Sequence, residues 1–67
     1  MSDKYFKPRM IIDLNKDHDG YCMITRAASI LHAHSLREQA REIHQRATVR
    51  GYEEHLCLRL LKEYMDI

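Results

Sequence analysis

Several residue types are scarce in this 67-residue chain, and each scarcity narrows what the protein can be. Two cysteines, Cys22 and Cys57, are too few for the disulfide framework of a small secreted domain. We therefore expect reduced thiols and a cytoplasmic protein, with a single Cys22–Cys57 bridge as the alternative. Two glycines cannot build a glycine-rich phosphate loop. No apolar run reaches the roughly 18 residues of a membrane span, and the first residues lack the apolar core of a signal peptide.

Charge of one sign is not in excess either. The 11 basic and 10 acidic residues leave a formal net charge of +1, which gives no strong overall attraction to nucleic acid or membrane surfaces. Hydrophobic residues make up 45% of the chain, too many for a disordered segment. The length predicts a single small domain over 1–67, and a chain of this size buries only about 60% of its unfolded surface.

The segment 36–50 carries helix signals at both ends. Ser35 and Glu38 have the S-x-x-E spacing of a capping box, in which each side chain bonds the other residue's backbone N–H. Gly51 stands where a helix commonly takes a left-handed C-terminal residue. One apolar stripe with helical spacing runs between these signals, formed by Leu36, Ala40, Ile43 and Ala47. Two of its members are Ala, so we expect close packing with modest buried area.

The segment 9–25 has the pattern of a β-hairpin. Two short apolar runs, RMIIDL and YCMIT, flank the polar loop Asn15–Gly20, which ends in Asp-Gly. A lone hairpin is marginal in water, so we expect it to pack against helices of the same chain. The fold class predicted is therefore α+β but mostly helical, an N-terminal hairpin followed by two or three short helices.

Two further helices are expected over 26–34, with Thr25 as N-cap, and over 52–65. One continuous helix from residue 25 to residue 50 is the alternative to a break before segment 36–50. At about 100° per residue, the apolar positions before His34 and those after Ser35 fall on opposite sides of such a helix. A continuous helix would bury opposite faces at its two ends, so we expect a break at His34–Ser35.

The helix expected over 52–65 has an apolar arc wider than one packing surface needs. It must be covered from two sides, either wholly by the rest of the chain or partly by a second protein. On the second interpretation the arc is a partner-binding surface with aromatic and leucine anchors and an arginine rim. Its predicted residues are Tyr52, Leu56, Arg59, Leu60 and Tyr64, and Arg37 is a second rim residue.

The loop Asn15–Gly20 partly matches a calcium-binding EF-hand. Asn15, Asp17, Asp19 and Gly20 occupy positions 1, 3, 5 and 6 of such a loop. Position 12, where a bidentate Glu is needed, is Arg26. A polar turn accounts for the same residues, so we expect no metal there.

The five histidines and two cysteines do not have the spacing of a zinc site, since no C-x-x-C or H-x-x-x-H occurs. A use of the histidines as a pH switch stays open. Catalysis by a thiol would need Cys22 or Cys57 beside a histidine in space, and Cys57 lies on the apolar side of its helix. We predict no catalytic residues, no metal and no cofactor, and expect that the protein is not an enzyme.

Arginines favour a nucleic-acid interface as the alternative function. Segment 36–50 contains Arg37, Arg41, Arg46 and Arg50. Arginine suits phosphates and base edges better than lysine does, because its guanidinium group forms paired hydrogen bonds. Segments 27–34 and 35–43 also have the rhythm of a helix-turn-helix. Glu38 and Glu42 among these arginines favour instead a solvated, self-neutralising helix face.

Two resemblances cover less than half of the chain. Ala28, Leu31, Ala40 and Ala47 are similar in position to the small and apolar residues of a tetratricopeptide-type helical hairpin. The run Ala40-x-x-Ile43-His44-x-x-Ala47 resembles the helical core of small bacterial proteins that restrain AraC-type activators. Small residues at any helix–helix contact produce both matches, so neither is taken as membership of a family.

Together these patterns predict a small regulatory or inhibitory module that acts through protein–protein contact. A homodimer is one form such a contact can take, and the identity of another protein partner does not follow from the sequence. The alternative is a transcriptional regulator that binds nucleic acid through the arginine-rich helix. No membrane partner is expected.

Overall fold

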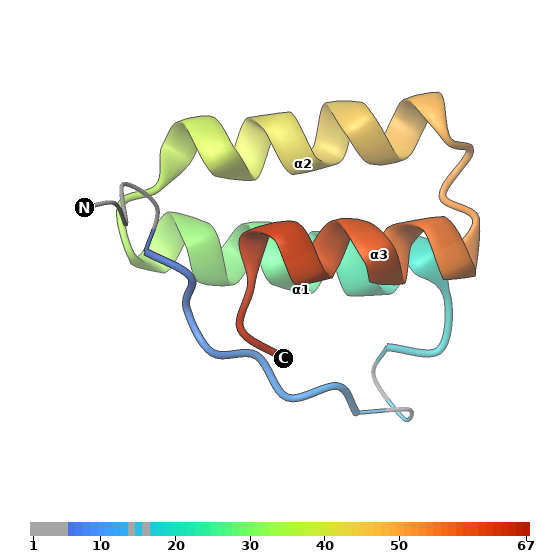
Figure 1. Cartoon of the computed structure of the whole chain (residues 1–67), viewed down its shortest axis with the longest axis horizontal. Helices are drawn as coiled ribbons and strands as arrows, with labels where there is room; N and C mark the ends of the chain where they lie inside the picture. The colour runs from blue at the N-terminus through green and yellow to red at the C-terminus, as the bar shows by residue number, and fades with distance from the viewer. Residues whose placement is uncertain (1–5, 14, 16) are drawn as a thin grey trace.

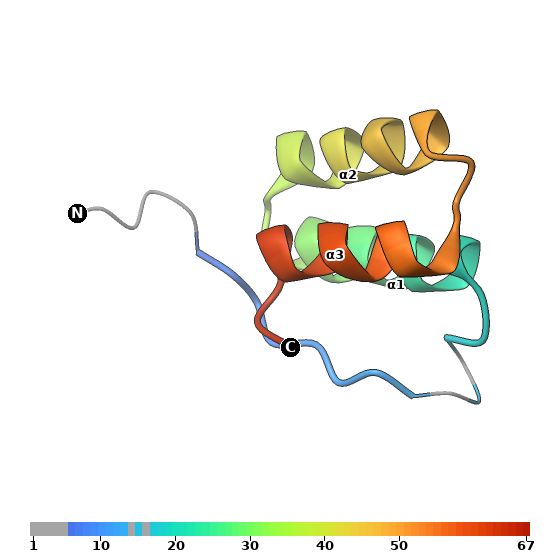
Figure 2. The same cartoon turned by 45° about the vertical axis from the view of Figure 1, so that its right-hand side comes forward.

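The computed structural model describes residues 6–13, 15 and 17–67, and its architecture is a bundle of three α-helices. The helices are α1 (Gly20–Ala33), α2 (Arg37–Val49) and α3 (Glu54–Tyr64). Successive helices run antiparallel, and each helix packs on the other two. Figures 1 and 2 show α2 lying along the pair formed by α1 and α3.

The predicted β-hairpin over 9–25 is wrong, and the α+β class with it. Among residues 6–13, 15 and 17–67 no β-strand forms, and only an isolated parallel bridge joins Arg9 to Asp66. Residues 21–25, expected as the second strand, are part of α1. Leu14 and Lys16, at the end of the first expected strand and in its loop, lie outside the described residues.

Local chemistry explains why α1 begins five residues before the predicted Thr25 cap. The Asp19 carboxylate accepts a hydrogen bond of 2.8 Å from the Cys22 backbone N–H, the action of an N-cap residue. The residues that α1 buries then recur at helical rather than alternating spacing: Met23, Ile24, Ala27, Ala28 and Leu31. The five-residue run YCMIT is too short to show this period by itself, because its first apolar residues fit either pattern.

The break predicted at His34–Ser35 is present, but Ser35 does not cap α2. Its φ of 63° is left-handed, and its N–H donates to the His32 carbonyl at 2.9 Å. The Leu36 N–H donates to the Leu31 carbonyl at 2.8 Å, which completes a Schellman motif at the end of α1. Ser35 therefore ends α1, whereas α2 begins after Leu36 with no side-chain cap. The predicted capping box with Glu38 is wrong.

The second junction has the same motif, with the predicted Gly51 in the left-handed position at φ 67°. The Gly51 N–H donates to the Thr48 carbonyl at 3.0 Å, and the Tyr52 N–H donates to the Ala47 carbonyl at 3.0 Å. Tyr52 is also left-handed, at φ 55°, so it belongs to the junction and not to the last helix. The last helix starts at Glu54. Glu53 is its N-cap, because the Glu53 carboxylate accepts a hydrogen bond of 3.1 Å from the Leu56 N–H.

All three helices contribute to one core. Its helical members with no exposed surface are Ile24, Ala27, Leu31, Ile43, Ala47, Cys57 and Leu61. Met23, Met65 and Met10 are almost as deeply buried. Methionine fills irregular space well because it is unbranched and flexible, and Met10 belongs to an irregular segment that packs against the helices.

That irregular segment is an N-terminal strap, residues 6–13, which crosses beneath α1 and α3 on the side away from α2 (Figure 1). The Met10 N–H donates to the Asp66 carbonyl at 3.1 Å, and the Asp66 N–H donates to the Pro8 carbonyl at 2.9 Å. Pro8 and Met10 are buried under these bonds. The strap therefore holds the residues that follow α3 against the start of the described chain.

In the part of the chain that the structure describes, no helix is long and apolar enough to cross a membrane.

Candidate functional site

The predicted partner-binding residues on and before α3 do not share one exposed surface. Leu60 is 2% exposed and belongs to the core, together with its neighbours Cys57 and Leu61. Leu56 is half-buried, and Arg59 is exposed. The wide arc is therefore largely covered within one chain, and its half-buried members, Leu56 and Leu58 among them, stay partly open to solvent beside the exposed Arg59.

Tyr64 is half-buried, and its hydroxyl joins α3 to α2. This hydroxyl donates to a Glu42 carboxylate oxygen and accepts from the Arg46 guanidinium at 3.0 Å. Arg46 also donates to both Glu63 carboxylate oxygens, at 2.8 and 3.3 Å. Burial and the Glu42 hydrogen bond raise the pKa of the Tyr64 hydroxyl, and the Glu63 carboxylate raises the pKa of Arg46. The tyrosine thus serves the α2–α3 contact.

Tyr52 is half-buried between the helix ends. Its ring packs edge-on against Tyr21 with 5.1 Å between centroids, and its hydroxyl lies 3.0 Å from Thr48 Oγ1 and 3.4 Å from His44 Nδ1. Tyr21 is 56% exposed, so this aromatic pair forms one edge of the surface at the start of α1.

A groove along α3, next to the residue that follows α2, contains part of the predicted surface. We name it the α3 groove and define it by its lining residues, Arg50, Leu56, Arg59, Leu60 and Glu63. Three of the five predicted partner-binding residues meet here, with a leucine base and charged groups on the rim.

The arginines predicted for nucleic acid are divided between different sides of α2. Arg46 is held by Glu63 and Tyr64, and Arg50 donates to the Arg46 carbonyl at 3.0 Å beside the α3 groove. Arg37 and Arg41 are exposed on the other side, toward α1. No single surface of the described chain therefore presents all four guanidinium groups.

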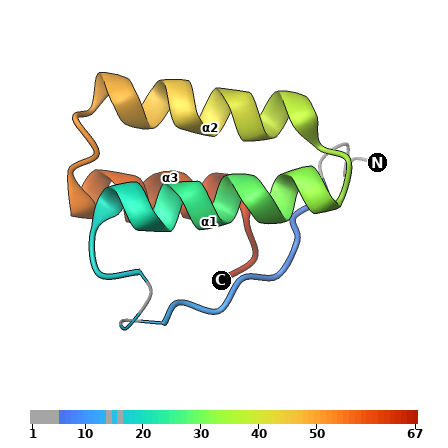
Figure 3. The ribbon, with the colours of Figure 1, turned by 180° about the vertical axis from the view of Figure 1, so that it is seen from behind.

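Arg37 and Arg41 line a second groove, between α1 and α2, with a volume of about 510 Å³. We name it the α1–α2 groove and define it by its residues: Thr25, Ala28, Ser29, His32, Arg37, Ala40, Arg41 and His44. Figure 3 shows these two helices side by side with α3 behind them. No acidic side chain is among its lining residues.

Glu38 and Glu42, which the sequence places among the arginines, face elsewhere. They line a pocket with Glu63, Tyr64 and Arg46 on the α3 side of α2. Glu38 and Glu42 thus face away from Arg37 and Arg41, and no acidic lining residue neutralises these two arginines across the α1–α2 groove.

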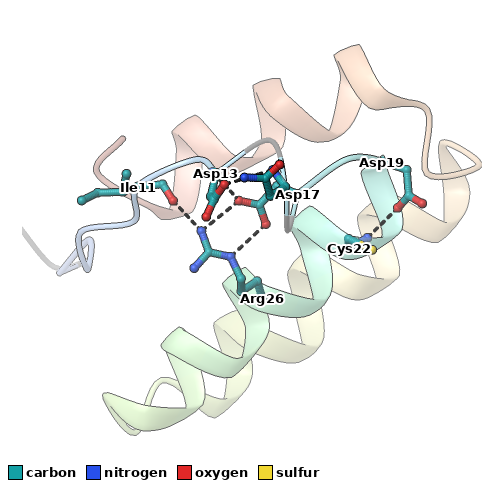
Figure 4. Close-up of polar contacts among 7 residues, drawn as sticks. Ile11, Asp13, Asp17, Asp19, Cys22 and Arg26 are labelled. Carbon is teal, nitrogen blue, oxygen red and sulfur yellow. Dashed lines mark hydrogen bonds and ion pairs between the residues drawn. The ribbon is translucent and has the colours of Figure 1, made fainter.

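The residues of the calcium-like loop have structural roles that the sequence analysis did not assign. Asp17 has no exposed surface, and Arg26 donates to its two carboxylate oxygens at 2.8 and 2.9 Å (Figure 4). The Asp13 N–H also donates to Asp17, at 2.8 Å, and Arg26 bonds the Ile11 carbonyl as well. Arg26, the residue that breaks the EF-hand pattern, is therefore the partner of Asp17. The hydrogen bonds to Asp17 raise the pKa of the Arg26 guanidinium.

One cluster has the residue types of a metal site. Ligand atoms of His18, Asp19 and Cys22 lie within 4.8 Å of one another, at an exposed position beside the start of α1. One Asp19 oxygen already caps the helix, which lowers the pKa of that carboxyl group. Partial burial and Asp19 raise the pKa of the Cys22 thiol, the reverse of the activation that a thiolate nucleophile or ligand needs. The sequence spacing did not predict this proximity.

In comparisons with models of protein families, with curated proteins and with solved structures, nothing matched this chain.

Proposed function

We propose that this protein is a non-enzymatic regulatory or inhibitory module that binds another protein through the α3 groove, and that it does so in the cytoplasm. The observation that supports this proposal is the meeting of Leu56, Arg59 and Leu60 in one open groove beside Arg50 and Glu63.

The chemistry of the groove suits a protein segment with one apolar side chain. Leucine surface at the base can desolvate an apolar anchor, and Arg50, Arg59 and Glu63 at the rim offer charged hydrogen bonds to its flanks. Leu60 itself is core, so it contributes to the shape of the groove more than to an exposed contact.

The test is affinity capture of the tagged protein from native lysate, with and without nuclease, repeated with two matched variants. Arg59→Glu changes the rim of the α3 groove, whereas Lys62→Glu makes the same charge change at another exposed position of α3. A stoichiometric protein that survives nuclease, is lost with Arg59→Glu and stays with Lys62→Glu supports the proposal. Equal retention by both variants contradicts it.

A homodimer is the form of this proposal in which the partner is a second copy. Light scattering on the purified protein distinguishes the two forms, because a homodimer has twice the monomer mass. The Arg59→Glu variant of such a homodimer should have the mass of a monomer. A monomer at all accessible concentrations leaves a different protein as the partner.

Nucleic-acid binding is the second candidate function, favoured by the exposed Arg37 and Arg41 beside a groove without acidic lining. Neutralising phosphates makes affinity fall steeply with salt. Binding to DNA or RNA that weakens and loses salt dependence on Arg37→Ala would support it, and capture unaffected by nuclease and salt would count against it.

A further inference from the structure

The three grooves between pairs of helices are treated differently by the rest of the chain. The strap covers the α1–α3 side (Figure 1), and the Tyr64–Arg46–Glu63 contacts bridge α2 to α3. Among the hydrogen bonds and ion pairs of the described residues, none joins a side chain of α1 to a side chain of α2. The α1–α2 groove is thus the one of these three that nothing covers or bridges in the described chain.

Its two walls have the spacing of helix-packing surfaces. On α1 the lining positions are 25, 28, 29 and 32, and on α2 they are 37, 40, 41 and 44. Each set is one helical face, since it follows the i, i+3, i+4, i+7 rule. Ala28 and Ala40 form a buried floor, at 8% and 3% exposed. Small residues on the floor allow another helix axis to approach closely, because contact distance depends on the side chains there.

Charge defines what such a helix must carry. Arg37 and Arg41 are one helical turn apart, a rise of about 6 Å along α2, and both are exposed. Carboxylates four residues apart on a docked helix have the same rise and can meet each guanidinium with paired hydrogen bonds. Ser29, His32 and Thr25 on the α1 wall add polar contacts of neutral or basic character.

We propose that the α1–α2 groove binds an acidic amphipathic helix of a partner protein, which lays small apolar side chains on Ala28 and Ala40 and pairs its carboxylates with Arg37 and Arg41. The docked helix becomes the fourth helix of a bundle. This surface is separate from the α3 groove, so the inference stands or falls independently of the proposed function.

The apolar floor favours a helix over nucleic acid. A phosphate backbone has no apolar surface to lay on two buried alanines, and both arginines lie on one wall only. A net charge of +1 is also low for a nucleic-acid binding protein, which typically has a broad basic surface.

The experiment uses the full chain and a synthetic helical peptide of about 18 residues, because much shorter isolated helices are marginal in water. One stripe of the peptide is Ala and Leu, and one flank carries glutamates four residues apart. A second peptide has lysines in place of the glutamates, and a short DNA duplex serves as the other polyanion. Affinities are measured by fluorescence anisotropy near physiological salt, where charges beyond about 8 Å are screened.

We expect the glutamate peptide to bind the wild type and the lysine peptide not to bind. The variant Arg37→Glu with Arg41→Glu should weaken the glutamate peptide by at least about tenfold and should gain binding of the lysine peptide. Arg9→Glu with Lys62→Glu makes the same change in net charge at exposed positions away from the groove, and it should leave affinity within about twofold. Circular dichroism shows that each variant is folded.

A second variant tests whether the peptide enters the groove, without changing charge. Ser29→Phe adds bulk at an exposed position of the groove wall, and it should also abolish binding of the glutamate peptide. The proposal is overturned if the two charge-reversal pairs weaken the peptide equally, or if Ser29→Phe leaves its affinity unchanged. It is also overturned if the DNA duplex binds the wild type more tightly than the peptide, since the groove is then a phosphate site.

Discussion

At the scale of single residues, one carboxylate is taken entirely out of water. Asp17 is wholly buried, and its charge is compensated by Arg26 from the second turn of α1 and by the Asp13 N–H. A buried ion pair adds little compared with apolar packing, but removal of one partner leaves the other charge uncompensated. Asp17 therefore fixes where the loop after the strap meets α1.

The variant Asp17→Asn keeps the side-chain size and removes the charge. We expect it to lower the free energy of unfolding by about 3 kcal/mol, the lower end of the range for a broken buried pair, because Arg26 remains 32% exposed. Urea denaturation followed by circular dichroism measures the change. Asp66→Asn, at an exposed carboxylate, is the control and should stay within about 0.5 kcal/mol. Equal losses would show that the ion pair is not the cause.

Gly20 is a second residue whose identity is set by its surroundings. A Cβ at this position would lie 2.1 Å from the Tyr52 carbonyl oxygen, which is backbone and cannot turn away. We expect Gly20→Ala to lower the free energy of unfolding by about 1–3 kcal/mol through overpacking. Gly51→Ala meets no atom within 4 Å and should cost only the left-handed strain, about 1 kcal/mol. Thermal and urea unfolding of both variants would contradict this account if Gly20→Ala were neutral.

At the scale of elements, the two junctions between helices are the same device built with different residues. Both close a Schellman motif, one with Ser35 and one with Gly51 in the left-handed position. Only the glycine adopts this conformation without steric cost. The left-handed residue of the first Schellman motif is therefore strained and that of the second is not, although Tyr52, which follows Gly51, is left-handed as well.

Replacing Ser35 by Gly should raise the free energy of unfolding by about 0.5–1 kcal/mol, the left-handed strain less the extra entropy of glycine in the unfolded chain. Ser35→Ala should stay within about 0.5 kcal/mol, because the hydroxyl caps no helix. Chemical denaturation of the two variants tests this. A loss of about 1 kcal/mol in Ser35→Ala would instead indicate an N-cap.

The α2–α3 contact should show a characteristic pH dependence through Tyr64. Its pKa is raised in the folded state, so its contribution is complete below the unfolded value near 10 and is lost as the pH rises through the folded value. The urea midpoint of the wild type should therefore fall at alkaline pH. Tyr64→Phe should lose about 1 kcal/mol at neutral pH and show a shallower alkaline fall. Parallel curves for the two proteins would exclude Tyr64 as the titrating group.

At the scale of the whole molecule, the strap links the start of the described chain to the residues that follow α3. It buries Pro8 and Met10 and bonds to Asp66 beyond α3. A chain of 67 residues buries only a small hydrophobic core, so the buried residues of a segment without regular structure can supply a large share of its stability.

Met10→Ala should lower the free energy of unfolding by about 2–3 kcal/mol, since it removes a buried side chain that is 3% exposed and leaves a cavity. The adjacent Ile11 is 72% exposed, and Ile11→Ala should stay within about 0.5 kcal/mol. Urea unfolding of the pair measures the difference. If both variants matched the wild type, the strap would not contribute to the folded core.

Much of the helical frame follows from the sequence because its causes are local. The opposed apolar phases before His34 and after Ser35 predicted the break between α1 and α2, and Gly51 marked the second junction. Asp19 is also an N-cap residue type, a local signal for the start of α1 that the predicted hairpin did not use.

Only the tertiary structure decided where side chains meet. It placed Leu60 in the core and left Leu56 and Arg59 at an open groove, and it separated Arg37 and Arg41 from Arg46 and Arg50. It also paired Asp17 with Arg26 and turned the expected first strand into a strap bonded to Asp66. The physical reason is that caps, turns and apolar periods act within a few residues, whereas burial and pairing depend on contacts between distant segments that form only when the chain is packed.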